Sequence, residues 1–197
     1  SPSLEVTAQR TPINVLSEPF HAVSIEKKGD GVWRVDMGVN FCGWTRVKLH
    51  GEPGQTIRFD YSERAQEKST FSLFSTIKLD KNGDGVFQNR FNYSSMRWIT
   101  VTGLKEEPKL EDFTGWNVCT NYETAASFET SDDLQNWIYH TGIWTFRNLS
   151  LGGYVVDCSQ RERMGYGGDA HATSESGMYN FGLDAFYYNW MQGWRDC

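Results

Sequence analysis

The hydrophobic pattern of this 197-residue chain changes once along its length, and that change constrains the fold more than any other feature. Before about Asn121 the pattern has a period of two, as in Trp44–His50 and, after a Glu52-Pro53-Gly54 turn, in Ile57–Tyr61. Such alternation is typical of strands with one buried face. Further strands are expected at residues 31–39, 86–93, 97–103 and 116–121. Short strands joined by Gly, Pro and Asp turns, with no helix between them, predict an antiparallel β-sandwich.

From Thr130 onward the period is that of a helix. Thr130 or Ser131 can cap a helix whose apolar residues recur every three or four positions. These residues are Leu134, Trp137, Ile138, Thr141 and Trp144. A second helix is expected from Asp169 to about Asn180, interrupted by Gly177. A third helix is expected to pack a stripe into a core, formed by Phe186, Trp190, Met191 and Trp194. We therefore predict a sandwich domain over residues 1–126 and a helical domain over residues 127–197.

Charge and cysteine content exclude several classes of function. The formal net charge of -6 argues against nucleic acid as a partner. No apolar run approaches the roughly 18–20 residues that span a bilayer, so no membrane is expected as a partner, and no signal-peptide pattern stands at the N-terminus. Cys42, Cys119, Cys158 and Cys197 form no Cys-x-x-Cys pair and are interpreted mainly as buried thiols. The four histidines show no ligand spacing either, so neither a metal nor another cofactor is expected.

One segment is far richer in reactive side chains than a fold requires. Residues 157–169 read Asp-Cys-Ser-Gln-Arg-Glu-Arg-Met-Gly-Tyr-Gly-Gly-Asp and contain three carboxylates, two arginines and three glycines. Carboxylates interleaved with guanidinium groups can bind sugar hydroxyls and hold one acid in its protonated state, as glycosidases require. A surface loop rich in salt bridges is the alternative. Gly165, Gly167 and Gly168 weigh against that alternative, because glycines let the backbone approach closely and turn sharply.

This segment closely resembles the signature of bacterial α-L-rhamnosidases of glycoside hydrolase family 78. Three upstream segments, Trp33–Trp44, Arg90–Ile99 and Ser127–Ser131, resemble other motifs of that family in the same order. The resemblance implies β-sandwich domains followed by an (α/α)6 barrel, a ring of paired helices that carries the active site. Only residues 131–197 follow Thr130, which is too few for such a ring. The chain is therefore expected to end inside the barrel, and the remainder of the same enzyme is its expected partner.

The resemblance also implies roles for individual residues of the segment. Glu162 matches the general acid of the family. Asp157 and Asp169 match flanking aspartates that bind sugar hydroxyls and whose negative charge tends to keep Glu162 protonated. Arg161 and Arg163 are expected to bind hydroxyls or to oppose that effect. Tyr166 stands where the family has a tryptophan, and its ring is expected to pack against the apolar side of a deoxy sugar.

The reaction implied by the resemblance is inverting hydrolysis that releases terminal α-L-rhamnose from a glycoside, oligosaccharide or polysaccharide. One acid protonates the departing oxygen while a second carboxylate, about 6.5–9.5 Å away, activates water on the opposite face. The family's base lies far downstream of the signature, so the isolated chain is expected to be inactive. Ser159 replaces the usual proline, one acidic residue before Glu162 is absent, and Tyr166 replaces tryptophan. These departures leave open a related six-hairpin glycosidase that acts on another sugar.

A non-catalytic carbohydrate-binding sandwich is the alternative from another class of protein. Trp33, Trp44, Trp98 and Trp116 would supply aromatic surfaces for sugar rings, although the alternation of these positions suits burial equally well.

A second motif, Asp80-Lys81-Asn82-Gly83-Asp84-Gly85, matches the first half of an EF-hand calcium loop. Phe91 stands at the twelfth position, where that loop needs a bidentate glutamate, and the flanks have strand patterns. A hairpin turn is therefore the preferred interpretation.

Overall fold

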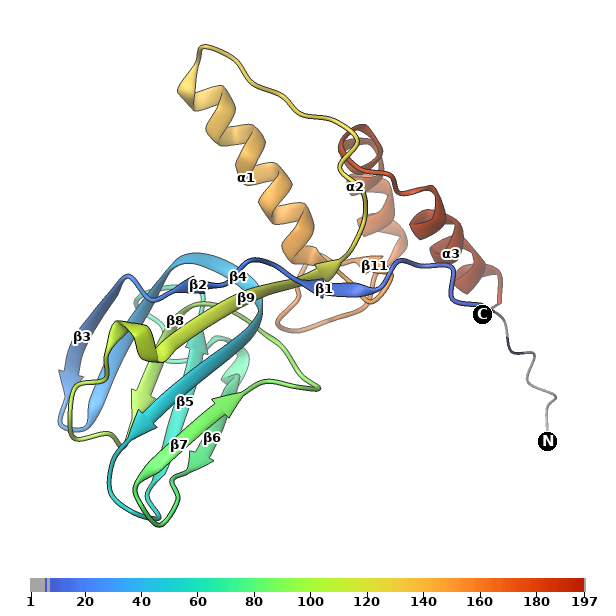
Figure 1. Ribbon diagram of the computed structural model, residues 1–197. Coiled ribbons are helices and arrows are strands. Elements are labelled where there is room, and N and C mark those ends of the chain that lie inside the picture. The colour runs from blue at the N-terminus through green and yellow to red at the C-terminus, as the bar shows by residue number, and fades with distance from the viewer. Residues whose placement is uncertain (1–5, 7, 197) are drawn as a thin grey trace. The chain divides into compact units, whose positions relative to one another are not determined.

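The computed structural model describes residues 6 and 8–196, which form two compact units (Figure 1). The sheet unit comprises Leu16–Val118 together with Cys158–Arg163. The helical unit comprises the described part of residues 1–15, Cys119–Asp157 and the described part of residues 164–197. The division falls inside strands β1 (Asn14–Leu16) and β9 (Phe113–Thr120).

The sheet unit is built from antiparallel strands, as predicted. Besides β9, these are β2 (Phe20–His21), β3 (Ser24–Gly29), β4 (Val32–His50), β5 (Thr56–Ser62), β6 (Phe74–Lys78), β7 (Asp84–Gln88) and β8 (Ser94–Thr102). Two single 3₁₀ turns, Thr70–Ser72 and Leu110–Asp112, lie in the connections. The strand order is β1-β9-β4-β8-β5-β6, with β2 beside β9 and with β3 and β7 beside β4.

Strand β4 takes part in both layers of the sandwich. Its first part pairs with β3 and β8, the pairing with β8 resumes at Phe41–Gly43, and the last part pairs with β9 and β7. The register against β8 shifts between Asp36 and Phe41, where Gly38 has a φ of 79° and donates its N–H to Asp36 Oδ1 at 2.8 Å. A bend of this kind lets one strand pass from one sheet to the other. The strands predicted at 31–39 and 44–50 are therefore a single strand.

The core of the sheet unit follows from the period-two pattern. Ile57, Phe59 and Tyr61 of β5 are all fully buried, as their alternation predicted. Truncating a buried phenylalanine of this kind typically costs about 3–5 kcal/mol, because the vacated space does not collapse. Gly43 lies where β4 approaches β9 so closely that an added Cβ would be 1.9 Å from the Trp116 carbonyl oxygen.

The four tryptophans considered as a sugar platform are packed into the sheet unit. Trp33 is buried and donates its indole N–H to the Leu104 carbonyl oxygen at 2.8 Å. Trp44, Trp98 and Trp116 are partly buried. These four side chains therefore do not form an open stacking surface, and the structure favours their role in packing.

The calcium-like motif forms a tight turn between β6 and β7. Asp80 Oδ1 accepts the backbone N–H groups of Asn82 at 2.7 Å and Asp84 at 2.9 Å, so this carboxylate closes the turn. These backbone hydrogen bonds lower the pKa of Asp80. The turn is confirmed, but it is not a simple hairpin, since β6 pairs with β5 and β7 pairs with β4.

The helical unit contains α1 (Asp133–Leu149), α2 (Gly167–Asn180) and α3 (Asp184–Arg195), with a two-stranded ribbon of β10 (Ser150–Leu151) and β11 (Tyr154–Val155). Asp132, and not Thr130 or Ser131, is the N-cap of α1, because its carboxylate accepts the N–H groups of Leu134 and Gln135. No helix in the described part of the chain is long and apolar enough to cross a membrane.

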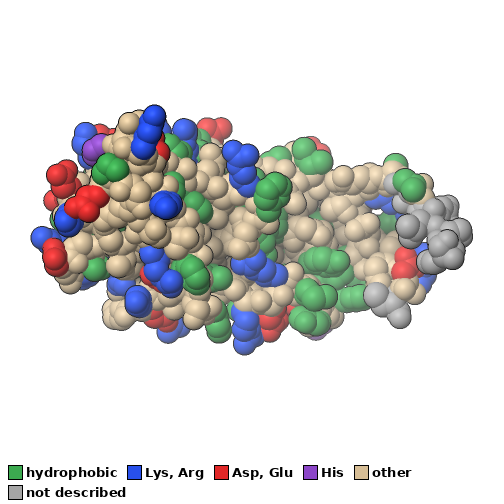
Figure 2. All heavy atoms as spheres, turned by 90° about the horizontal axis from the view of Figure 1, so that it is seen from below, with side chains coloured by type: hydrophobic (Ala, Val, Ile, Leu, Met, Phe, Trp, Pro, Cys, Tyr) green, Lys and Arg blue, Asp and Glu red, His purple; other side chains and the backbone are tan. Residues whose placement is uncertain are grey.

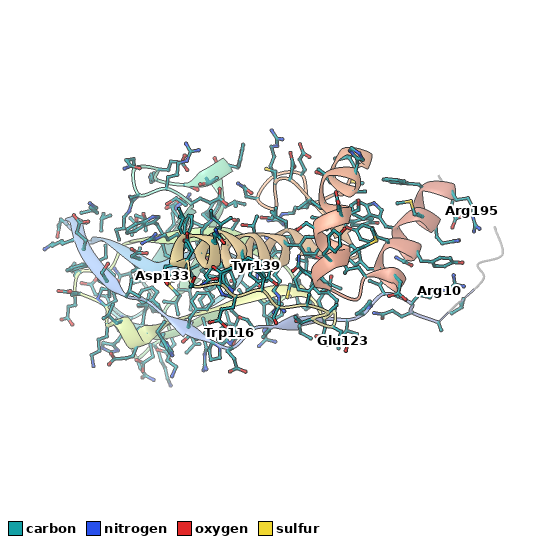
Figure 3. The ribbon with its side chains drawn as sticks, turned by 90° about the horizontal axis from the view of Figure 1, so that it is seen from above. Arg10, Trp116, Glu123, Asp133, Tyr139 and Arg195 are labelled. Atoms are coloured by element: carbon teal, nitrogen blue, oxygen red, sulfur yellow. The ribbon has the colours of Figure 1, made fainter. Side chains whose placement is uncertain are left out.

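The face of α1 that packs is not the predicted apolar stripe. Leu134, Trp137 and Ile138 are exposed, whereas Phe146 is buried and Ile143 is partly buried against the same core. Tyr139, labelled in Figure 3, also lies on the packed face and donates its hydroxyl to Asn180 Oδ1 of α2 at 2.9 Å. The helical unit therefore leaves the first part of the predicted stripe uncovered, whereas Trp144 is partly buried.

The core of the helical unit is mostly aromatic and includes Tyr122, Phe146, Phe181, Phe186 and Trp190. Of the stripe predicted for α3, Phe186 and Trp190 are buried, while Met191 and Trp194 are each nearly half exposed.

Gly177 does not interrupt α2, contrary to the prediction. An added Cβ there would lie 2.9 Å from both Leu183 and the Phe146 ring, so close packing explains the glycine. Cys42 and Cys119 are buried and Cys158 is partly buried, and none of the three forms a disulfide within the described residues, whereas Cys197 lies outside them.

Candidate active site

The central part of the signature, Cys158–Arg163, is a compact loop that belongs to the sheet unit although its sequence neighbours belong to the helical unit. The N–H groups of Arg161 and Glu162 both donate to the Cys158 carbonyl oxygen, at 3.3 and 3.1 Å, which closes the loop into a turn. Ser159 is buried, as is typical of a residue that anchors a loop. The loop therefore presents Glu162 from a defined backbone position.

Glu162 forms an ion pair with its neighbour in the sequence. Its Oε1 accepts a short hydrogen bond from Arg161 Nη2, and 28% of the Glu162 side chain remains exposed. The Arg161 guanidinium also lies 5.8 Å from the centre of the Phe71 ring. The structure thus brings Arg161 and Glu162 together, with the arginine positioned to neutralise the carboxylate and the carboxylate still reachable from solvent.

Arg163 connects the loop to the segment that precedes β8. Its guanidinium donates to Asn92 Oδ1 at 2.6 Å, to the Tyr93 carbonyl oxygen at 2.8 Å and to the Ser159 carbonyl oxygen at 3.2 Å. It also stacks on the Tyr93 ring, 4.3 Å from its centre. Burial raises the pKa of the Tyr93 hydroxyl, while the Arg163 charge acts in the opposite direction. Arg163 is therefore engaged with protein groups on several sides.

Glu63, which follows β5, forms the second connection. Its Oε2 accepts a hydrogen bond from Gln160 Nε2 of the loop at 2.7 Å. Its Oε1 accepts a short hydrogen bond from Ser95 Oγ of β8 and a longer one, 3.5 Å, from Asn40 Nδ2 of β4. Both carboxylate oxygens are thus used, and one carboxylate joins the loop to two strands of the sandwich.

The remaining residues of the signature lie in the helical unit. Asp157 is exposed and directly precedes the loop. Asp169 stands in the first turn of α2 and accepts the Tyr166 N–H at its Oδ2, at 2.8 Å. This contact places Tyr166 and Asp169 together at the start of α2, where the helix dipole favours the negative charge. The Tyr166 side chain is 54% exposed.

The three glycines of the signature differ in their surroundings. An added Cβ at Gly165 would lie 2.5 Å from the Trp190 ring, so close approach requires glycine there. Gly168 has open space around it, and Gly167 only ordinary contacts with Trp194. None of the three has a positive φ, so the expected sharp turning is instead found at Arg163, whose φ is 59°.

The large cavity of the helical unit does not contain these residues. A space of about 790 Å³ is lined by residues of the N-terminal segment and of α3, among them Asn189 and the two arginines labelled in Figure 3, Arg10 and Arg195. Its lining has no pair of carboxylates suited to acid–base chemistry, so the candidate active site is assigned to the signature segment, residues 157–169. Within the described residues, no group of three or more His, Cys, Asp or Glu side chains could hold a metal ion.

Comparison with known proteins gives two family matches that adjoin along the chain. Residues 26–119 match the bacterial alpha-L-rhamnosidase concanavalin-like domain. Residues 123–197 match the bacterial alpha-L-rhamnosidase 6 hairpin glycosidase domain. The chain belongs to the bacterial α-L-rhamnosidases of glycoside hydrolase family 78.

Individual α-L-rhamnosidases agree with this assignment. An α-L-rhamnosidase from Formosa agariphila is 28% identical over 203 residues, which cover 96% of this chain and 21% of the relative. The solved α-L-rhamnosidase from Dictyoglumus thermophilum has a TM-score of 0.81 and 28% identity, covering 90% of this chain and 21% of that one. The structure from Streptomyces avermitilis, complexed with L-rhamnose, has a TM-score of 0.89 at 24% identity over 98% of this chain and 19% of that one, which shows a common fold. The chain spans about a fifth of the length of these relatives.

The residues that hold the Cys158–Arg163 loop of this rhamnosidase chain could not be identified from the sequence. Asn92 and Tyr93 lie in a segment quoted for its resemblance to the family, but their pairing with Arg163 joins positions about seventy residues apart. Glu63 follows the well-predicted strand Ile57–Tyr61 and looks like an ordinary surface carboxylate in the sequence. The one sequence feature that could have drawn attention to Glu63 is its position, as a carboxylate directly after a buried strand.

Proposed function

We propose that the chain is part of an inverting α-L-rhamnosidase and carries its general acid, Glu162. The observation that supports this role is a partly exposed carboxylate on a loop whose two sides are held by protein contacts, within the family signature. A general acid must come within hydrogen-bond reach of the glycosidic oxygen, and a fixed but accessible carboxylate meets that requirement.

In the proposed reaction, Glu162 donates its proton to the departing oxygen of a rhamnose-containing glycoside or oligosaccharide. A second carboxylate, about 6.5–9.5 Å away in inverting enzymes, removes a proton from the attacking water. We assign that base to a part of the enzyme outside this chain, and we therefore expect the isolated chain to be inactive. The Arg161–Glu162 ion pair has to open when substrate binds, because an acid that donates a proton cannot remain an ionised partner of arginine.

We assign sugar binding to Asp157, Arg161, Tyr166 and Asp169. Carboxylates accept hydrogen bonds from sugar hydroxyls, and a guanidinium freed from Glu162 can donate to them. The exposed Tyr166 ring can pack against the apolar face of a deoxy sugar. We also retain the division into a sandwich domain, residues 1–126, and the start of a barrel, residues 127–197, which follows the change from strands to helices.

The test uses the full-length enzyme that contains this chain. Wild type and Glu162→Gln are compared on an alkyl α-L-rhamnoside, and the anomer formed first is identified by proton NMR. We expect β-L-rhamnose from the wild type, and a loss of roughly 10²–10⁴-fold in kcat for the variant. Undiminished cleavage by Glu162→Gln would refute the role of Glu162, and the α anomer as first product would refute inversion.

A panel of aryl glycosides tests the sugar. Rhamnoside is expected to be the preferred substrate, in line with the names of the relatives. Strong preference for another sugar would favour a related six-hairpin glycosidase, for which the replacement of tryptophan by Tyr166 would be the first residue to examine.

A further inference from the structure

The loop that carries Glu162 contacts two separate parts of the sandwich, one of which is itself held by a third part. Glu63 follows β5, Asn92 and Tyr93 precede β8, and Asn40 comes from β4. We propose that Glu63 and Arg163 are positioning residues, which hold the loop so that Glu162 can protonate the leaving group. This inference rests on the proposed function of Glu162 and assigns a catalytic contribution to the sandwich.

The backbone of Arg163 gives the first argument. Arg163 directly follows Glu162 and has a φ of 59°, in the left-handed region that residues other than glycine seldom adopt. A conformation of this kind persists only where surrounding contacts impose it. Here the guanidinium provides those contacts, with three hydrogen-bond acceptors and the Tyr93 ring. The direction in which the chain leaves Glu162 therefore depends on the Arg163 side chain.

The hydrogen bonds of Glu63 give the second argument. An ionised carboxylate only accepts hydrogen bonds, and all the groups that face Glu63 in these contacts, from Gln160, Ser95 and Asn40, are donors. The arrangement fixes Gln160, two residues before Glu162. Glu63 and Arg163 thus act on opposite sides of the acid, one before it and one after it in the loop.

Fixing both sides matters because proton donation is sensitive to geometry. A misplacement of about 1 Å can cost on the order of 10²-fold in rate. This loss of rate should be largest for substrates whose leaving group must be protonated before it departs. A nitrophenolate leaves as a stable anion with little protonation, whereas an alkoxide leaves only when protonated. Displacement of the loop should therefore lower the rate of hydrolysis of an alkyl rhamnoside much more than that of a nitrophenyl rhamnoside.

This selectivity separates positioning from a merely structural role. Residues that only stabilise the fold would change the amount of active enzyme, and so would lower the rates on both substrates by the same factor. Arg97 provides a matched control on the same unit. Its guanidinium donates two hydrogen bonds to Asp36, at 2.8 and 2.9 Å, and lies 5.3 Å from the Trp98 ring, so it resembles Arg163 in its contacts without touching the loop.

The experiment uses the full-length enzyme with the substitutions Glu63→Gln, Arg163→Lys, Gln160→Ala, Arg97→Lys and Glu162→Gln. For each, kcat is measured on 4-nitrophenyl and on methyl α-L-rhamnoside, and folding is checked by circular dichroism. For Glu63→Gln and Arg163→Lys we expect a loss of roughly tenfold or more on the methyl glycoside and less than about threefold on the nitrophenyl glycoside. Arg97→Lys should leave the ratio of the two rates unchanged.

Equal losses on both substrates, or unchanged rates, for Glu63→Gln and Arg163→Lys would overturn the inference. If Arg163→Lys does not fold, Glu63→Gln and Gln160→Ala decide, because each removes contacts only on the other side of the loop. Failure of the proposed function is a different result, in which Glu162→Gln itself retains wild-type rates on the methyl glycoside. If the enzyme prefers another sugar, the same two leaving groups on that sugar give the same test.

Discussion

The sheet unit and the helical unit bury their apolar side chains to different extents. In the sheet unit the alternating residues of β5 and β8, such as Phe59, Tyr61 and Ile99, are fully buried. In the helical unit, α1 leaves Leu134 and Trp137 63% and 64% exposed, although they belong to its apolar stripe. Figure 2 shows hydrophobic side chains at the molecular surface.

The difference shows what a hydrophobic period can and cannot predict. A period identifies the residues that share a face, but not the neighbour that covers it. The sandwich supplies its own second layer, so the apolar face of β5 was predictable, although Asp60 on the opposite face of that strand is buried as well. Helix α1 packs through Tyr139, Ile143 and Phe146 instead, and Leu134, Trp137 and Ile138 of its apolar stripe stay exposed. This agrees with a chain that spans about a fifth of its rhamnosidase relatives.

The largest effect should come from the core of the sheet unit. Phe59→Ala is expected to lower the free energy of unfolding by about 3–5 kcal/mol, because the side chain is fully buried and leaves a cavity. Urea unfolding followed by circular dichroism measures the change. Phe91→Ala is the matched control, since Phe91 is fully exposed and its loss should change stability by less than about 0.5 kcal/mol. Similar losses for both would mean that the sheet unit is not the self-contained core described here.

Two glycines of the helical unit should respond in opposite directions. Gly177→Ala is expected to destabilise by roughly 1–3 kcal/mol, because its Cβ would collide with Leu183 and Phe146. Gly142→Ala in α1 is expected to stabilise by about 0.5–1 kcal/mol, because nothing lies within 4 Å and alanine favours the helix. Thermal unfolding measures both. A stabilising Gly177→Ala would show that the core of the helical unit is loosely packed.

Acid should destabilise the sheet unit through Asp36. Burial alone would raise the pKa of Asp36, but hydrogen bonds from Arg97 and from the Gly38 N–H, together with the Arg97 charge, outweigh it and hold this pKa below its usual value. The resulting stabilisation is complete above the ordinary carboxyl pKa of about 3.9 and is lost as the pH falls through the lower, folded-state value.

The substitution Asp36→Asn tests this dependence. It is expected to cost about 1–2 kcal/mol at neutral pH and to flatten the loss of stability below about pH 4. Thermal unfolding as a function of pH, for wild type and variant, measures both effects. Parallel curves for the two proteins would exclude Asp36 as a source of the acid sensitivity.

The smallest effect should come from the exposed stripe of α1. In the chain of residues 1–197, Trp137→Gln is expected to change the free energy of unfolding by less than about 0.5 kcal/mol. Trp190→Gln, at a buried position, should cost several times more. Chemical denaturation of the two variants measures the contrast, and a large loss for Trp137→Gln would show that the stripe is covered in solution.

Local rules predicted much of the fold. The alternation at Ile57–Tyr61, the turn at Glu52-Pro53-Gly54 and the helix ending at Asn180 all appear in the structure. The predictions that failed depended on tertiary neighbours. Gly177 was interpreted as a helix breaker because the sequence does not show that Phe146 packs against it.

The sequence could predict which residues belong to the candidate site, but not how the loop that carries them is held. The signature segment identified Glu162 and its neighbours, and their assignment to a site remains a proposal. The attachment of the loop could not be predicted, because it depends on pairings between positions far apart in the sequence, such as Glu63 with Gln160. The left-handed backbone of Arg163 has no local signal either, since neither glycine nor asparagine marks it.

Because β4 contributes backbone hydrogen bonds to β3 and β8 and then to β9 and β7, we expect the strands on the two sides of β4 to unfold together. Heat should therefore remove the whole sandwich in a single calorimetric peak, with no species in which one layer survives.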